Sequence, residues 1–210
     1  MKKGLWLLLP LLWLSHIAGA QDLQAVRMLR TSQKTLASLQ DFHARFSYVI
    51  DNPEMPRATP RAGHIRYKKG KYAILLSDQE VYCDLETQWI YLVPDKEVNV
   101  MPYDPEEGVT LESIFRIYEA SAKSRYDGQE RIHGNTCERI YLAITDPSLD
   151  YNQAYVWINA ASMLIEKVAL IDRKQTTTTY EFWDIKTNNG FSDSDFRFDP
   201  SKYPGVVIYD

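Results

Sequence analysis

A switch in the period of the hydrophobic pattern is the feature that most constrains how this chain folds. Between residues 22 and 40 apolar residues recur at roughly helical spacing, at Leu23, Val26, Leu29, Leu36 and Leu39. In the next segment every second residue is apolar or aromatic, at Phe42, Ala44, Phe46, Tyr48 and Ile50. The pattern predicts an amphipathic helix, with Asp22 as its N-cap or first-turn acid, followed by a strand with one buried face.

Further short strand segments follow to near the end of the chain, most of them alternating, with a strongly apolar one at 163–171 and a β-branched run at the start of 175–183. They lie at residues 64–68, 72–74, 81–83, 89–93, 98–100, 136–145, 152–159, 163–171 and 175–183. Turn residues such as Lys69-Gly70 and Pro94-Asp95 separate them. Evenly spaced short strands indicate an antiparallel meander of about ten strands. Such a sheet can curl into a barrel or half-barrel, or fold into a sandwich.

One further helix is expected among the strands. Thr110 can cap a segment from 111 to 120, whose apolar face consists of Leu111, Ile114, Phe115 and Tyr118. An isolated helix of this length is marginal in water, so it must lie on an apolar surface. The simplest arrangement places both helices across the open mouth or concave face of a curled sheet. The fold class is therefore mainly β with helices (α+β).

The N-terminus has the three parts of a secretory signal peptide. Lys2 and Lys3 precede an apolar run from residue 5 to 14, and small residues at 18–20 form a cleavage site. The alternative, a membrane anchor, is disfavoured because the run is too short to span a bilayer. We expect residues 1–20 to be cleaved and residues 21–210 to form a single exported domain.

Charge and motifs narrow the function classes. The formal net charge is −4, and it becomes −6 when Lys2 and Lys3 leave with the signal peptide. A mildly acidic chain with mixed charges is a poor candidate for binding nucleic acid or anionic membranes. No nucleophile elbow, zinc-protease motif or phosphate-binding loop occurs, so we expect no enzyme, no cofactor and no metal site. A scattered pair of carboxylates acting on glycans remains the enzymatic alternative.

The mature chain has two cysteines, Cys83 and Cys137. An oxidising compartment permits them to form a disulfide. The alternative is two separate half-buried thiols on two strands, each packing as a small apolar side chain. The spacing does not decide between these, although the second is slightly favoured.

The C-terminal segments resemble a known family. The chain reads F-W-D-I-K-T-N at 182–188, F-R-F at 196–198 and P-G-V-V-I at 204–208. This is similar to the closing pattern of the periplasmic lipoprotein carrier proteins, the LolA family. The stretches G-H-I-R-Y-K-K at 63–69 and S-D-Q-E-V-Y at 77–82 resemble two central motifs of the same family. Each motif is moderately specific, and their order and spacing along nearly the whole mature chain strengthen the match.

The resemblance implies an unclosed antiparallel β-barrel or half-barrel, with a helical lid over a hydrophobic cavity. In the family this cavity holds the acyl chains of lipoproteins. The protein would take acylated lipoproteins from an inner-membrane lipoprotein-releasing transporter, cross the periplasm as a monomer, and deliver them to an outer-membrane acceptor. A sensor of the same fold, which binds lipid or a partner without transport, is the alternative.

The expected ligand-binding residues follow from the alternating aromatic pattern together with the resemblance. Each of them is otherwise an ordinary core residue. They are Phe42, Phe46, Tyr48, Ile65, Tyr67, Tyr72, Ile74, Trp89, Tyr91, Val93, Leu111, Ile114, Phe115, Tyr118, Tyr155 and Trp157. The family holds its lid with an arginine at the position of Lys69. This lysine lacks the planar fork of arginine, so it is either a weaker lid lock or a solvated turn residue.

Overall fold

The computed structural model describes residues 22–56, 58–104 and 121–209, without the side chains of residues 121 and 122. The predicted signal peptide and the predicted helix at 111–120 lie outside these ranges. Within them, no helix combines the length and the apolar character needed to cross a membrane.

The predicted N-terminal helix is confirmed as α1 (Leu23–Ser38). Asp22 is its N-cap, and one carboxylate oxygen accepts hydrogen bonds from the backbone N–H groups of Gln24 and Ala25. The other oxygen accepts from the N–H of Tyr126 on the last strand of the sheet, at 2.8 Å. These bonds, that of Tyr126 foremost, lower the pKa of Asp22. Asp22 therefore both starts the helix and ties it to the sheet edge.

The described strands form one sheet of twelve, in the order β12-β6-β5-β4-β3-β2-β1-β11-β10-β9-β8-β7. Their bounds are β1 (Phe42–Asp51), β2 (Arg61–Lys68), β3 (Lys71–Leu76), β4 (Gln79–Cys83), β5 (Thr87–Leu92), β6 (Glu97–Pro102), β7 (Ser121–Ile132), β8 (Asn135–Ile144), β9 (Tyr151–Asn159), β10 (Ile165–Asp172), β11 (Thr177–Thr187) and β12 (Val207–Tyr209). The predicted antiparallel meander is confirmed for β1 to β6 and for β7 to β11. The two runs are joined by the antiparallel pairing of β1 with β11, and β12 runs parallel to β6.

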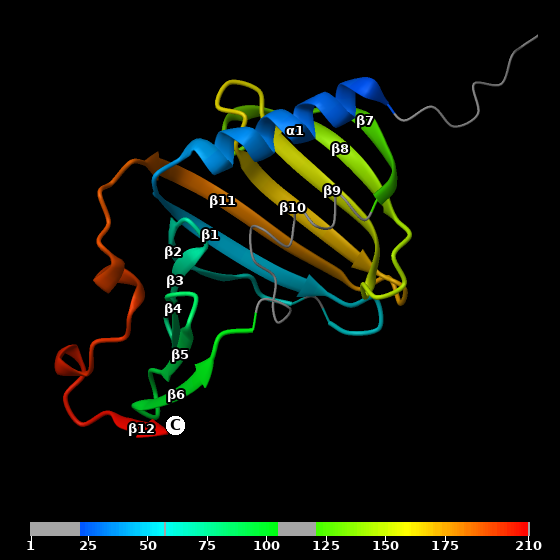
Figure 1. Cartoon of the computed structure of the whole chain (residues 1–210). Coiled ribbons are helices and arrows are strands. Elements are labelled where there is room, and N and C mark those ends of the chain that lie inside the picture. The colour runs from blue at the N-terminus through cyan, green and yellow to red at the C-terminus, as the bar shows by residue number, and fades with distance from the viewer. Residues whose placement is uncertain (1–21, 57, 105–120, 210) are drawn as a thin grey trace, which may run out of the picture.

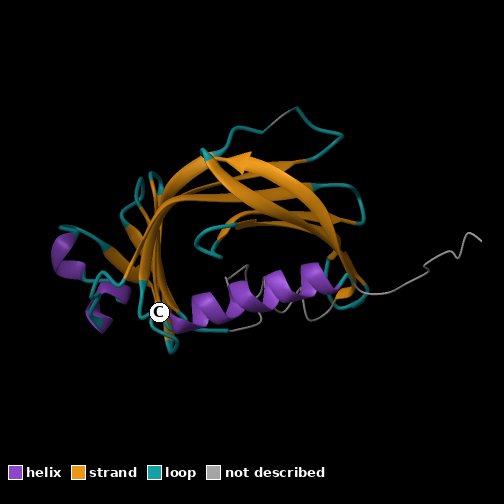
Figure 2. Cartoon of the chain, turned by 90° about the horizontal axis from the view of Figure 1, so that it is seen from above, coloured by secondary structure: helices purple, strands orange, loops and turns teal. Residues whose placement is uncertain are grey.

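The sheet curls without closing, and α1 lies across its open side (Figures 1 and 2). We call the face that α1 covers the inner face and the opposite one the outer face. The half-barrel with a helix over it matches the predicted architecture. The sheet is open because its first and last strands, β12 and β7, form its two edges and do not pair with each other.

Two clusters of buried side chains fill the inner face beneath α1. One joins Ala25 and Leu29 of the helix to alternate residues of β8, β9 and β10, among them Ile140, Val156 and Leu170. The second cluster lies on β1, β2 and β11 and consists of Phe42, Ala44, Phe46, Ile65 and Phe182. The predicted burial of the even positions of β1 is thus confirmed at its start, whereas Ile50 at its end is half exposed.

The outer face of β3 to β6 is covered by the chain that follows β11. We call residues 188–206 the C-terminal strap. It contains the short 3-10 helices η1 (Asp193–Phe196) and η2 (Pro200–Lys202) and leads into β12 (Figure 1). Its buried side chains Phe196 and Phe198 pack with Ala73, Tyr82, Tyr91 and Val98 of the sheet.

Carboxylates fasten the strap to the sheet. Asp41 is 2% exposed and accepts hydrogen bonds from the backbone N–H groups of Asn189, Gly190 and Phe191. Asp84 accepts from the Arg197 guanidinium at 2.7 Å. Burial raises the pKa of both carboxyl groups, but the hydrogen bonds outweigh it and leave each pKa lowered. Asp41 and Asp84 are therefore ionised anchors at neutral pH.

Two strands lay outside the prediction. β7 reads S-A-K-S-R-Y-D-G-Q-E-R-I and has too few apolar residues to show an alternating pattern. The register of β7 against β8 shifts between Tyr126 and Gln129, a stretch that contains Gly128. β7 is an edge strand, so it pairs with a neighbour on one side only. β12 has only three residues, all exposed, and pairs with one strand.

Candidate functional site

The inner face continues beyond α1 across β2 to β6, and this stretch is the candidate ligand-binding surface. Residues paired directly across antiparallel strands share a face. One such row runs from buried Ala44 through Ile65, Ile74, Val81 and Ile90 to Asn99. From Ile74 onward its members are half-buried. The row thus passes from solid core under the helix to a partly accessible apolar surface.

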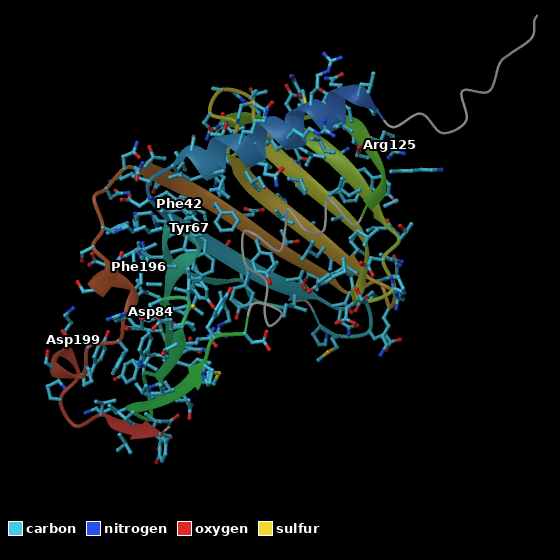
Figure 3. The ribbon with its side chains drawn as sticks, in the orientation of Figure 1. Phe42, Tyr67, Asp84, Arg125, Phe196 and Asp199 are labelled. Atoms are coloured by element: carbon cyan, nitrogen blue, oxygen red, sulfur yellow. The ribbon has the colours of Figure 1, made fainter. Side chains whose placement is uncertain are left out.

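A parallel row begins with aromatic side chains. Phe42 stacks on Tyr67 with ring centroids 5.1 Å apart. Figure 3 labels the two residues, which lie where β1 and β2 meet. The row continues through Tyr72, Cys83 and Gln88. Beneath α1, a small cavity of about 30 Å³ lies against Phe42, with walls almost entirely apolar: Ser32, Leu36, Leu39, Phe42, Ala44, Leu164, Ile165, Phe182 and Ile185. It is far too small for an acyl chain, so a chain can enter here only if α1 moves.

A small polar group lies within this inner face. The side-chain amide of Gln88 donates to the hydroxyl of Tyr72 at 2.8 Å, and Cys83 is paired with Tyr72 across β3 and β4. Burial is the main cause that raises the pKa of Tyr72. The hydroxyl is therefore neutral, and the face carries no buried charge at this point.

Seven of the predicted ligand residues lie on the inner face: Phe42, Phe46, Tyr48, Ile65, Tyr67, Tyr72 and Ile74. Tyr48 also accepts a hydrogen bond from Arg61 and stacks with Tyr180. Whether these residues hold a ligand stays a prediction. Leu111, Ile114, Phe115 and Tyr118 lie outside the described residues.

The placement of Trp89, Tyr91 and Val93 requires a correction. We expected them to face the same side as Phe42 and Phe46, but they lie on the outer face under the strap. The ring of Tyr91 lies 5.5 Å from Phe198 and 4.6 Å from Tyr203. Strands β3 and β5 are apolar on both faces, so alternation could not say which set faces inward.

Tyr155 and Trp157 require the same correction. Their neighbours Ala154 and Val156 lie in the core under α1, which places both aromatic residues on the outer face. There the indole N–H of Trp157 donates to Glu130 at 2.8 Å, and the Lys167 ammonium lies 5.0 Å from its ring. Trp157 therefore has its hydrogen-bond and cation–π partners on the outer face, on the side of the sheet opposite to the candidate ligand surface.

Lys69 lies in the turn between β2 and β3, exposed and with a φ of 49°. Among the described residues it has no side-chain hydrogen bond or ion pair. Its neighbours Lys68 and Lys71 do have a partner, because both bind Asp193 of the strap, at 3.0 and 2.9 Å. They lower the pKa of Asp193 to about 2. The lysines of this turn thus hold the strap, and the role of Lys69 in locking a lid stays a prediction.

The two cysteines are free and buried. Cys83 faces inward on β4, whereas Cys137 lies in an outer-face cluster on β8, and six strands separate them in the sheet. Cys137 donates to the buried carboxylate of Glu166 at 3.4 Å. The disulfide that the compartment permits is absent, and the alternative of two separate thiols is confirmed.

Burial raises the pKa of both thiols, that of Cys137 to about 12, so little thiolate forms at neutral pH. We expect a thiol reagent at pH 7.5 to label neither cysteine of the native protein within minutes and both after unfolding, without any reductant. Mass spectrometry counts the labels. Labelling of the unfolded chain that appears only after reduction would contradict the free-thiol structure.

Sequence reasoning missed four inner-face residues and the two anchors, Asp41 and Asp84. The inner-face residues are Val81, Ile90, Leu92 and Met101. Continuous apolar runs such as W-I-Y-L-V at 89–93 could have revealed them, since such a run indicates a strand covered on both faces. Asp41 gave no signal, because its partners lie about 150 residues later in the chain.

Comparisons with known proteins give likenesses of structure only. No family model and no curated protein matches the sequence. An uncharacterized conserved protein from Thermus thermophilus is 11% identical, with a TM-score of 0.57, over 89% of this chain and 99% of that one. MucB, in the Pseudomonas aeruginosa MucA/MucB complex, is 15% identical with a TM-score of 0.52, over 81% of this chain and 61% of its own. A LolA superfamily protein from Nitrosomonas europaea is 10% identical, with a TM-score of 0.43, over 83% and 97%.

The likenesses to the Thermus thermophilus protein and to MucB show a shared fold. The open, curled antiparallel sheet with a helix across it agrees with the architecture that the LolA resemblance predicted. The predicted unclosed half-barrel with a helix across it is therefore confirmed.

Proposed function

We propose that this chain is a periplasmic carrier that binds the acyl chains of lipoproteins on its inner face and moves them from the inner to the outer membrane. The observation that carries the proposal is the row of half-buried apolar side chains on β3, β4 and β5. Ile74 packs against the cluster that Leu36 of α1 and the C-cap residue Leu39 also contact. Val81 and Ile90 continue this row onto β4 and β5, where each is half-buried. The sequence resemblance to lipoprotein carriers supports the same assignment.

The energetics fit reversible binding. Each methylene of an acyl chain that leaves water contributes about 0.8 kcal/mol, so covering several methylenes is enough to retain a chain. Deeper binding requires α1 to leave Phe42 and Phe182, whose contacts the ligand then replaces. The net affinity is a difference between these two contributions, which allows release without an energy source in the carrier.

A charge placed on the inner face tests the proposal. We expect Ile74→Glu to weaken binding of a fluorescent diacylated lipopeptide about tenfold or more, because the carboxylate loses water when the chain covers it. Ala62→Glu is the matched control, since Ala62 is exposed on the outer face of the adjacent strand. Both variants are checked for an unchanged melting transition. Equal affinities of Ile74→Glu and the parent would contradict an inner-face site.

A sensor that binds lipid or a partner protein is the second candidate, because the similar MucB structure was solved with MucA. Native mass spectrometry of the purified protein distinguishes the two. Acylated peptides bound to the protein, and their transfer to outer-membrane fractions, support the carrier. Bound phospholipid without transfer supports the sensor.

A further inference from the structure

Three basic side chains of α1 form a stripe on the side of the helix that faces away from the sheet. Arg27, Arg30 and Lys34 are exposed, and the exposed Leu23 precedes them. At about 100° per residue, these four positions fall within about 60° of one another around the helix axis. The buried positions Ala25, Leu29 and Ser32 lie on the opposite side. We call residues 23, 27, 30 and 34 the basic stripe.

The stripe has no acidic neighbour on its own element. The sequence of α1 contains no Asp or Glu. Among the residues that the structure describes, none of Arg27, Arg30 and Lys34 forms an ion pair. Most basic residues on the outer face are paired, for example Arg139 with Asp127 at 3.0 Å. The positive charge of α1 is therefore not neutralised by any side chain that the structure describes.

The acidic net charge of the whole chain does not prevent the basic stripe from attracting anions. We expected a protein of net charge −6 without a basic patch to avoid anionic membranes. Charges farther away than about 8 Å are screened at physiological salt, so a surface responds to the nearest side chains. The stripe is about 16 Å long and presents three cations in that range. The fold gathers on one helix face what the sequence spreads over twelve residues.

We propose that the basic stripe docks the protein on an anionic bilayer surface, with α1 between the membrane and the inner face. Charge complementarity selects the phosphate-bearing surface, and Leu23, which is 67% exposed, supplies an apolar side chain that can enter the headgroup region. Because α1 lies across the open side of the sheet, docking brings that side to the membrane (Figure 2). This inference goes beyond the carrier function and holds equally for a lipid sensor.

Vesicle flotation with the full chain tests the inference. Vesicles of phosphatidylcholine are compared with vesicles containing about 40% phosphatidylglycerol, at about 50 and 300 mM salt. We expect binding only to the anionic vesicles, and weaker binding at the higher salt. Each basic side chain near such a surface is worth about fivefold in affinity, so Arg27→Gln, Arg30→Gln and Lys34→Gln together should weaken binding roughly 100-fold.

The matched control removes the same charge elsewhere. Lys96, Arg131 and Lys174 are exposed and without ion pairs among the described residues, and their triple change to Gln should leave binding near the parent value. Glutamine keeps helix propensity similar, so circular dichroism of the stripe variant should not change. Equal loss in both triple variants, or no preference of the parent for anionic vesicles, overturns the proposal. The parent could show no preference for anionic vesicles while the stripe variant alone fails to exchange lipopeptide with membrane fractions. That result would make an acidic protein, and not a bilayer, the partner of the stripe.

Discussion

Gly63→Ala should lower the free energy of unfolding by about 3 kcal/mol or more. Gly63 pairs with Phe46 on one side and Leu76 on the other, in the middle of the sheet. A Cβ at this position would overlap the backbone carbonyl oxygen of Leu75 and press on the side chain of Leu76. A backbone atom cannot move aside as a flexible side chain can, so β2 and β3 must separate. Urea unfolding, followed by tryptophan fluorescence, measures the change.

Gly134→Ala is the matched control for a different property of glycine. Gly134 has a φ of +88°, but an added Cβ meets nothing within 4 Å. Its substitution costs only the left-handed backbone conformation, about 1–2 kcal/mol. The excess at Gly63 therefore isolates the steric clash between the strands. Two equal losses would show that β2 and β3 adapt to the additional carbon.

Asp41→Asn should be the second severe change, with a loss of about 3 kcal/mol. The carboxylate of Asp41 accepts from three backbone N–H groups of the strap and from the side-chain amide of Asn189 at 3.1 Å. An asparagine side chain turns an NH₂ group toward one or more of these donors and removes the charge. Limited proteolysis should then cut the strap early. Asp184→Asn, which removes an exposed ion pair with Arg45, should change stability by less than about 1 kcal/mol.

The same anchor has a defined pH dependence. The pKa of Asp41 is lower in the folded than in the unfolded protein, so the unfolded chain binds the proton first as pH falls. Its contribution is complete at neutral pH, declines below about pH 4, and is lost once the pH is below the folded pKa. The parent should therefore lose more stability between about pH 5 and pH 3 than Asp41→Asn does. Parallel curves for the two proteins would show that Asp41 is no ionised anchor.

The sequence predicted the local elements well and the faces of the sheet poorly. The helix from Leu23, its Asp22 cap and the strand with buried Phe42 and Phe46 depend on contacts and spacings within a few residues. The side to which Tyr91 points depends on the strap, which lies about 100 residues later in the chain. Aromatic character suggests a ligand face, but in β5 it marks the contact of Tyr91 with Phe198.

The candidate site was therefore half predictable. The seven inner-face residues of β1, β2 and β3 could be predicted, because the alternation in β1 is clear. The register of β1 with β2 then determines which residues of β2 share that face. From β4 onward both faces carry apolar side chains, and the periodic signal disappears. The ionised anchors were not reached either, since hydrogen bonds to backbone groups distant in sequence leave no pattern.

The strap also imposes an order on folding. During synthesis the N-terminus emerges first, so β3 to β6 are made long before residues 191–206, which cover Ala73, Tyr82 and Val98. Likewise β1 must wait for β11 before its second edge is paired. Until the last twenty residues are released, half of the sheet has a bare apolar face and open edges, which favour aggregation. A chain that stops before residue 191 should consequently need a chaperone to prevent aggregation. The complete chain covers this apolar face itself when the strap folds onto it.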